Sequence, residues 1–330
     1  MTYASGQLIQ ATDYNGFVST TAGANVNATW STGATNAGWG QTALGTVAAG
    51  GTVTATQWSS LVNTLSAMGS QTGTTITSRV APTAGTLISV LANVNTDLTN
   101  CYNNRGNAST SGTAYGTFSG AVSKTTATSN GTQGAWTITF TTTVTFPSAD
   151  AARYFFNAGG IVKIQYGKSS TGTDHDPEWN TLAGWCGSIN ITGGGAQTIA
   201  GQAYTGTTRL GGTGGVQTTL VTGSGWYNFT TSPLTIFQLN SSTAAYTGEY
   251  IRTTATATSS TVLTLVTTWV EDGTAVVGST TNITGGTAVA SPSTTIGAAT
   301  APTTLVTYVP PSTTYLTASW GTPTIASSVA

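Results

Sequence analysis

The chain has 330 residues, of which 38% are hydrophobic and 9% aromatic, but only eight are Lys or Arg and nine are Asp or Glu, for a net charge of −1. Charged residues make up 5% of the chain, against about 25% in ordinary soluble domains. So few scattered cations exclude a basic surface for nucleic acid. The sequence has no apolar run of about 20 residues, so no membrane span is predicted. The aromatic content argues against a disordered chain.

Residues 1–106 predict a small helical domain with an assembly or attachment role, because three segments place apolar side chains at helical spacing. The start signals of these segments are Asp13, Thr54 or Thr56, and Pro82 followed by Thr83. The stop signals of the second and third segments are Gly69 and Gly106. The side chains that we expect to pack between these helices, or against neighbouring copies, are Trp58, Leu61, Leu65, Leu87, Leu91 and Leu98.

The character of the chain changes after these helical segments. Residues 107–115 are Asn, Ser, Thr and Gly with little else and no periodicity, which predicts a linker or an exposed connection. In residues 116–330 the apolar period becomes two, as in Trp136–Phe140 and Val262–Val270, while Asp150–Phe156 predicts one helical turn. Strands rich in Thr, Val, Ile and aromatics are typical of an antiparallel β-sandwich or jelly roll, with outward threonines keeping it wetted. The predicted fold class is therefore α+β, a small helical domain followed by a β-sandwich.

The most polar stretch surrounds the only histidine of the chain, and its members are Asp174, His175, Asp176 and Glu178. These side chains could bind Ca²⁺ through oxygen, or a transition metal through the imidazole. Their spacing matches no EF-hand loop, and the glycine before them and Pro177 within them are typical of a turn. We therefore expect a solvated loop here, with a metal site as the weaker alternative, and no cofactor.

The sequence predicts no catalytic site. His175 is the only histidine, and no GxSxG segment occurs that would supply it with a serine nucleophile. Glu271 with Asp272, or Asp174 with Glu178, could form the acid and base pair of a glycosidase. However, Glu271 and Asp272 stand between an alternating strand and a glycine, where a hairpin turn is favoured. The chain is therefore expected not to be an enzyme.

Two further groups of side chains have both a structural and a functional interpretation. Cys101 and Cys186 lie far apart without a CxxC motif, so two ordinary buried thiols are expected, with a single disulfide bridge as the alternative. Trp226 and Tyr227, or Trp179 and Trp185, could stack on a sugar ring. Packing in the core or between subunits is favoured for them, and contact with a host glycan is the alternative.

Six short motifs between residue 8 and about residue 272 resemble segments of one family of proteins. They are Leu8–Asn15, Trp30–Gln41, Val53–Trp58, Ala152–Gly160, Gly225–Ser232 and Tyr246–Ile251. Together they resemble segments of virion structural proteins of tailed bacteriophages, notably those of cyanophages and other aquatic phages. Members of that family are described as virion, tail or fibre-like components. The resemblance therefore implies a structural role and carries over no catalytic residue.

The sparse charge leads to the same expectation on physical grounds. Copies with almost no net charge do not repel one another, and burial of apolar area at roughly 25 cal/mol per Å² would drive their association. The predicted function is a virion structural protein that forms homo-oligomers and binds other virion proteins, as a tail, fibre or decoration component. We expect no nucleic-acid partner and no insertion into a membrane.

The start of the sequence shows no basic stretch before an apolar core, so no secretory signal is predicted. We therefore expect assembly in the host cytoplasm, release by lysis, and a final location in the virion. The alternatives are a receptor-binding tail fibre that recognises host surface polysaccharide, a tail-associated polysaccharide depolymerase, and a cellular surface-layer or filament protein.

Overall fold

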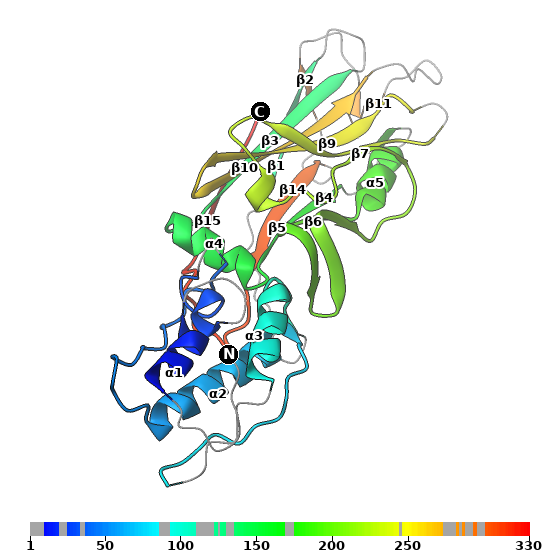
Figure 1. Ribbon diagram of the computed structural model, residues 1–330. Helices are drawn as coiled ribbons and strands as arrows, with labels where there is room; N and C mark the ends of the chain where they lie inside the picture. Colours follow the sequence, from blue (N-terminus) through cyan, green and yellow to red (C-terminus); the bar gives the residue numbers. More distant parts are fainter. Residues whose placement is uncertain are drawn as a thin grey trace.

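The computed structural model shows a mixed α+β protein whose larger part consists of antiparallel sheets. It describes residues 10–19, 25–33, 37–85, 93–109, 122–124, 126–129, 135–168, 175–243, 246–272, 282–283, 286–287, 293–295 and 301–330. Figure 1 shows helices α1, α2 and α3 gathered at one end and the sheets at the other, with α4 between them. Among the described residues, no helix is long and apolar enough to cross a membrane.

The helical end is built around α2, which is the longest helix that the structure describes. The helices here are α1 (Ala11–Val18), α2 (Ala55–Thr72) and α3 (Val94–Asn103), with the 3-10 turn η1 (Val26–Ala28). A capping box starts α2, because the Thr54 hydroxyl accepts from the backbone N–H of Gln57 and the Gln57 side chain accepts from that of Thr54. Trp58 then packs edge-on against Tyr14, with ring centroids 5.5 Å apart.

The expected start of the third helix is wrong, and the end of the second lies further on. Residues 82–85 are not helical, and α3 begins at Val94 after Asn93, whose φ is +60°. Helix α2 continues past Gly69 and ends at Gly73, whose φ of +66° is the left-handed conformation that favours glycine. A glycine inside a helix costs only about 1 kcal/mol relative to alanine, so packing of the flanking Leu65 and Met68 in the core keeps the helix going.

The packing residues predicted for this end lie in one core within a single chain. Trp58, Leu61, Leu65 and Leu98 are all at most 1% exposed. Leu87 and Leu91 lie outside the described residues. Of the two partners expected for this apolar stripe, neighbouring helices and neighbouring copies, the described members contact the first.

The smaller sheet has five strands in the order β1-β14-β4-β5-β6, with all neighbours antiparallel. Its strands are β1 (Val122–Ser123), β4 (Ile161–Gly167), β5 (Ser188–Ile199), β6 (Gln202–Leu210) and β14 (Thr303–Val309). Strands β5 and β6 form a long hairpin that extends back toward the helical end (Figure 1).

The larger sheet has eight strands, with the order β13-β2-β3-β10-β9-β8-β7 and with β15 also paired to β3. Its strands are β2 (Thr126–Ser129), β3 (Trp136–Thr145), β7 (Val216–Leu220), β8 (Leu234–Asn240), β9 (Tyr250–Ser259), β10 (Val262–Glu271), β13 (Ser293–Thr295) and β15 (Thr324–Val329). A separate short pair consists of β11 (Asn282–Ile283) and β12 (Gly286–Thr287). Burial alternates strictly along β3 and β10, which confirms the period-two strands predicted there.

The two sheets contact each other through their apolar faces. The Tyr166 hydroxyl in β4 lies 2.8 Å from the Thr253 hydroxyl in β9, and its ring stacks on Phe237 of β8. Trp136 of β3, Trp179 of helix His175–Cys186 and Trp269 of β10 are fully buried beside one another. They lie at the end of the sheets that is farther from α1, α2 and α3.

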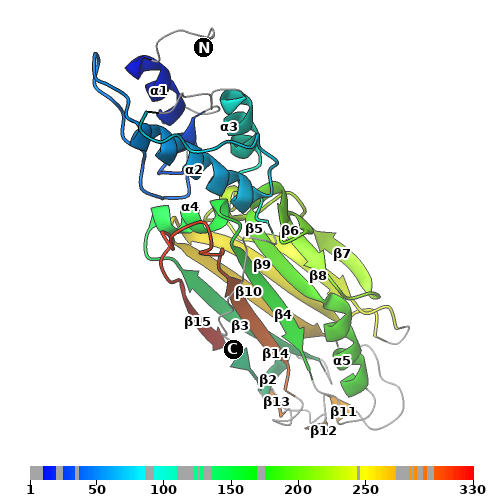
Figure 2. The same ribbon diagram turned by 90° about the horizontal axis from the view of Figure 1, so that it is seen from below.

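Two helices flank the sheets. Helix α4 (Ala149–Asn157) is longer than the single turn predicted from its sequence, and Figure 2 shows it between the sheets and the helical end. Helix α5 (His175–Cys186) lies beside the smaller sheet, where the sequence predicts a loop.

Candidate functional site

The polar cluster around the histidine is not a solvated loop from residue 175 onward. His175 and Asp176 begin α5, although the directions of their side chains are not described, and Asp174 lies outside the described residues. Glu178 is only 7% exposed and accepts hydrogen bonds from the hydroxyls of Ser241 and Thr243. The signal was misread because Pro177 stands in the first turn of a helix, where proline is tolerated.

The described part of the chain contains no group of three or more His, Cys, Asp or Glu side chains arranged to share a metal ion. Glu271 is fully buried at the end of β10 and accepts a hydrogen bond of 3.3 Å from the Trp179 indole N–H. The hairpin turn expected at Glu271 is therefore wrong for this residue, because its side chain points to the core face of the strand.

Two of the aromatic residues considered for sugar stacking, Trp226 and Trp179, pack inside the chain, and Tyr227 is partly exposed. Trp226 is 8% exposed and stacks on Phe156, with ring centroids 5.4 Å apart. The Tyr227 ring is about half exposed, but its hydroxyl donates to the Asn157 side chain at 2.8 Å. Trp179 is fully buried. The contacts of Trp226 and Trp179 agree with the packing interpretation, while Tyr227 stays partly accessible.

Both cysteines are free and buried. Cys101 lies in α3 at the helical end and Cys186 ends α5, which matches the prediction of two ordinary buried thiols. Burial and then the nearby Asp97 carboxylate raise the pKa of Cys101 to about 12. Burial also raises the pKa of Cys186.

Three of the six sequence motifs meet where the helical end contacts the sheets. The Trp39 indole N–H donates to the backbone carbonyls of Asn157 and Arg105, at 3.0 Å and 3.1 Å, and the Asn157 side chain donates to the Gly38 carbonyl. Gly40 is required beside Trp39, because its φ is +72° and a Cβ there would lie 2.4 Å from the Tyr154 ring. In the motif around Trp226, that ring stacks on Phe156 of α4 and the Tyr227 hydroxyl donates to the Asn157 side chain.

The segment expected to be a linker is part of the same contact. Ala108 is 2% exposed and pairs by backbone hydrogen bonds with Thr198 and Ala200 at the tip of the β5–β6 hairpin. The Asn107 side chain accepts from the Thr198 backbone N–H at 2.8 Å. Residues 107–109 are therefore held by hydrogen bonds to the β5–β6 hairpin and do not form an exposed linker. Residues 110–115 lie outside the described residues.

The C-terminal region supplies a third tie to the helical end. Gln41 accepts from the Thr317 backbone N–H at 2.8 Å and donates to its carbonyl at 3.0 Å. The Ser319 hydroxyl donates to the Trp39 carbonyl. We call this set of contacts the joint; its members are Trp39, Gln41, Asn107, Ala108, Asn157, Thr198, Thr317 and Ser319. Sequence reasoning singled out the motifs but had no signal for their meeting, because the partners lie up to 280 residues apart.

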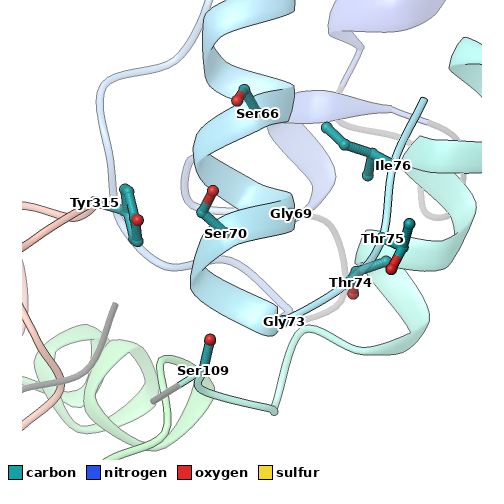
Figure 3. A pocket seen from close by; sticks show the side chains of 9 residues that line it. All are labelled: Ser66, Gly69, Ser70, Gly73, Thr74, Thr75, Ile76, Ser109 and Tyr315. Carbon is teal, nitrogen blue, oxygen red and sulfur yellow. The ribbon is translucent and has the colours of Figure 1, made fainter. Parts of the chain in front are cut away.

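An open pocket of about 320 Å³ lies beside the joint, at the C-terminal end of α2. Its lining residues are Ser66, Gly69, Ser70, Gly73, Thr74, Thr75, Ile76, Ser109 and Tyr315. Figure 3 shows Ser66 and Ser70 facing Tyr315 on one side of the helix, while Thr74 to Ile76 turn back along its other side after Gly73. No residue in this lining is charged, and six of the nine carry a hydroxyl group.

The outer face of the larger sheet is equally neutral. Ten threonines alternate with core residues at its outward positions, and we call them the threonine face: Thr137, Thr139, Thr141, Thr143 and Thr145 on β3, Thr264 and Thr268 on β10, and Thr254, Thr256 and Thr258 on β9. Arg252 is the one charged residue at an outward position of these three strands.

No protein-family model, no curated protein and no solved structure matches this chain.

Proposed function

We propose that this chain is a structural component of a tailed-bacteriophage particle that associates with copies of itself through the threonine face. In this proposal the two sheets are the layers of a β-sandwich, the helical end attaches the subunit to other virion proteins, and the protein is found in the virion. The observation that carries the proposal is a broad face of β3, β9 and β10 on which Arg252 is the one charged residue, in a chain where charged residues make up only 5%.

The chemistry of the threonine face suits contact with an identical surface. Each threonine presents a methyl group and a hydroxyl group on a stiff β-branched side chain, so little rotamer freedom is lost when the face is covered. Thr258 and Thr264 already pair through their hydroxyls at 2.6 Å, which shows that neighbouring strands satisfy these groups locally. Two copies of the face would bring no like charges together apart from Arg252.

The joint supports a structural role for the conspicuous motifs. Trp39 and Asn157, which belong to two of the phage-like segments, are used to fix the helical end to the sheets. An element that holds two parts of a subunit in one orientation is what a particle component needs. The resemblance to virion proteins of tailed phages points in the same direction.

Charge placed on the threonine face tests the self-association. The double substitution Thr141→Lys and Thr254→Lys puts two cations on the face, two strands apart, where their repulsion and desolvation oppose contact. The control, Asn63→Lys with Thr313→Lys, adds the same charge at exposed positions outside the face. We expect sedimentation velocity to show that the face variant needs at least about tenfold more protein to assemble, which corresponds to about 1.4 kcal/mol.

Equal behaviour of the face variant and its control would rule out the face as the contact. A wild-type chain that stays monomeric at high concentration would refute self-association altogether. The virion assignment is tested separately. Phage particles whose genome encodes this chain are purified and labelled with antibodies raised against it. Unlabelled particles would refute that assignment.

A further inference from the structure

The pocket beside the joint combines hydroxyl groups, one aromatic ring and a helix C-terminus, and it takes no part in the proposed contact between copies. From this combination we infer that the pocket binds a neutral carbohydrate of one or two sugar rings.

The hydroxyl groups are the first argument. Thr74 is already engaged, since its hydroxyl lies 2.7 Å from that of Thr72 and accepts from the Asn104 side chain at 3.0 Å. Within the described part of the chain, the side chains of Ser66, Ser70 and Thr75 form no hydrogen bond. Hydroxyl groups both donate and accept, so they match the mixed donors and acceptors of a sugar.

Tyr315 supplies the second argument. Its ring is half-buried and forms one wall of the pocket opposite Ser66 and Ser70 (Figure 3). The C–H face of a sugar ring is apolar and packs on an aromatic face, while the edge of the sugar presents its hydroxyls. A ring on one side and hydroxyls on the other reproduce this division.

The C-terminal end of α2 and the uncharged lining together favour a neutral ligand over an anionic one. Helix α2 is 18 residues long, and the carbonyl end of a helix carries a partial negative charge. The last backbone carbonyls accept from Gly73, Thr74 and Ser109. An anionic group such as a phosphate, a sulfate or an acidic sugar would face this negative end without any cation in the lining. A neutral ligand that donates hydroxyl hydrogens is favoured instead.

The pocket is held in shape by contacts already described. The Ser109 backbone N–H donates to the Gln71 carbonyl at 2.7 Å, and Gly73 ends the helix in a fixed left-handed turn. Thr317, two residues after Tyr315, is bound to Gln41 through both its backbone groups. Walls that are fixed before binding lose little entropy when a ligand arrives. A volume of about 320 Å³ lies at the lower end of the range of ligand pockets, which suits a mono- or disaccharide.

Saturation-transfer NMR with the full chain tests the inference. The probes are neutral saccharides (glucose, galactose, mannose, N-acetylglucosamine, lactose and maltose), with glucuronic acid and sialic acid as anionic comparators. We expect transfer to at least one neutral saccharide, with a dissociation constant on the order of 1 mM, and at least tenfold weaker binding of both acids.

Matched variants locate the site. Ser66→Trp fills the pocket from an exposed position of α2 and should abolish transfer, while Asn63→Trp adds the same side chain to an exposed position of the same helix outside the lining and should leave it unchanged. Tyr315→Ala should weaken binding at least about fivefold, and Tyr250→Ala, which removes a half-buried ring elsewhere, should not.

The inference is overturned if no neutral saccharide binds the wild-type chain, if binding survives Ser66→Trp, or if an acidic sugar binds best. Loss of binding in Asn63→Trp as well would also overturn it, because that result places the sugar elsewhere. Self-association of each variant, measured by sedimentation, separates this outcome from failure of the proposed assembly.

Discussion

The helical end and the sheet region bury their carboxylates in different ways. Asp97 of α3 is paired with Arg79 at 2.6 Å, and both side chains are at most 6% exposed. Glu178 of α5 is instead held by the hydroxyls of Ser241 and Thr243. Asp97 is therefore held by a cation, together with the Thr77 backbone N–H, whereas Glu178 is held by neutral hydroxyl donors. The difference predicts how strongly each region depends on a single side chain.

The largest effect is expected at the ion pair. Arg79→Ala leaves the Asp97 carboxylate buried without its cation, which should cost about 3–5 kcal/mol of unfolding free energy. Urea denaturation measures the loss. As a control, Asp150→Asn removes a partner of Arg153 from a pair in which Asp150 is 65% exposed, and it should cost less than about 1 kcal/mol. Similar losses for both variants would contradict the role given to burial.

A smaller effect is expected at the joint. Trp39→Phe keeps a ring but removes the N–H that serves the carbonyls of Asn157 and Arg105, so buried acceptors lose a donor at a cost of about 1–3 kcal/mol. Trp30→Phe is the control, since this half-buried ring contacts Trp39 edge-on and donates no recorded hydrogen bond within the described residues. Calorimetry should show a lower Tm for Trp39→Phe than for Trp30→Phe.

Substitution of the hydroxyl-bound carboxylate should be milder than loss of the ion pair. Glu178→Gln keeps the shape of the side chain and one acceptor oxygen, while its amide can donate to one of the two hydroxyls. We expect a loss of about 1 kcal/mol in urea denaturation. A loss as large as that of Arg79→Ala would mean that the two regions do not differ in the way described.

The smallest effect at neutral pH concerns the thiols. Because the pKa of Cys101 is raised to about 12 from its ordinary value of 9.0, the folded state keeps this proton longer than the unfolded state. Its contribution to stability is therefore complete below about pH 9 and is lost as the pH rises from 9 to 12. At pH 8 iodoacetamide should label Cys101 only after unfolding. Rapid labelling of the native chain, read by mass spectrometry, would contradict its burial.

The sequence predicts the elements whose signals are local. Thr54 is one of the two caps that the sequence predicts for α2, and the alternation from Trp136 onward gives β3, because both signals depend on neighbours a few residues away. The start of α3 and the helix at Pro177 are missed, since turn-forming residues also occur at helix starts.

The candidate site is predicted less well than the fold. The Ala108 pairing with Ile199 and the wall formed by Tyr315 join segments far apart in the chain, and nothing in the local pattern of either segment signals its partner. Trp226 is an aromatic residue that could stack on a sugar, but tertiary packing places its ring on Phe156 instead. The local sequence does not signal this contact.

The joint has a mechanical consequence. Tension applied between the helices and the sheets would load the Trp39, Ala108 and Gln41 contacts together, because their partners Asn157, Thr198 and Thr317 lie in three separate stretches of the chain. Bonds that share a load must break at once rather than one after another. The joint would therefore transmit a tilt of the helical end to the sheets.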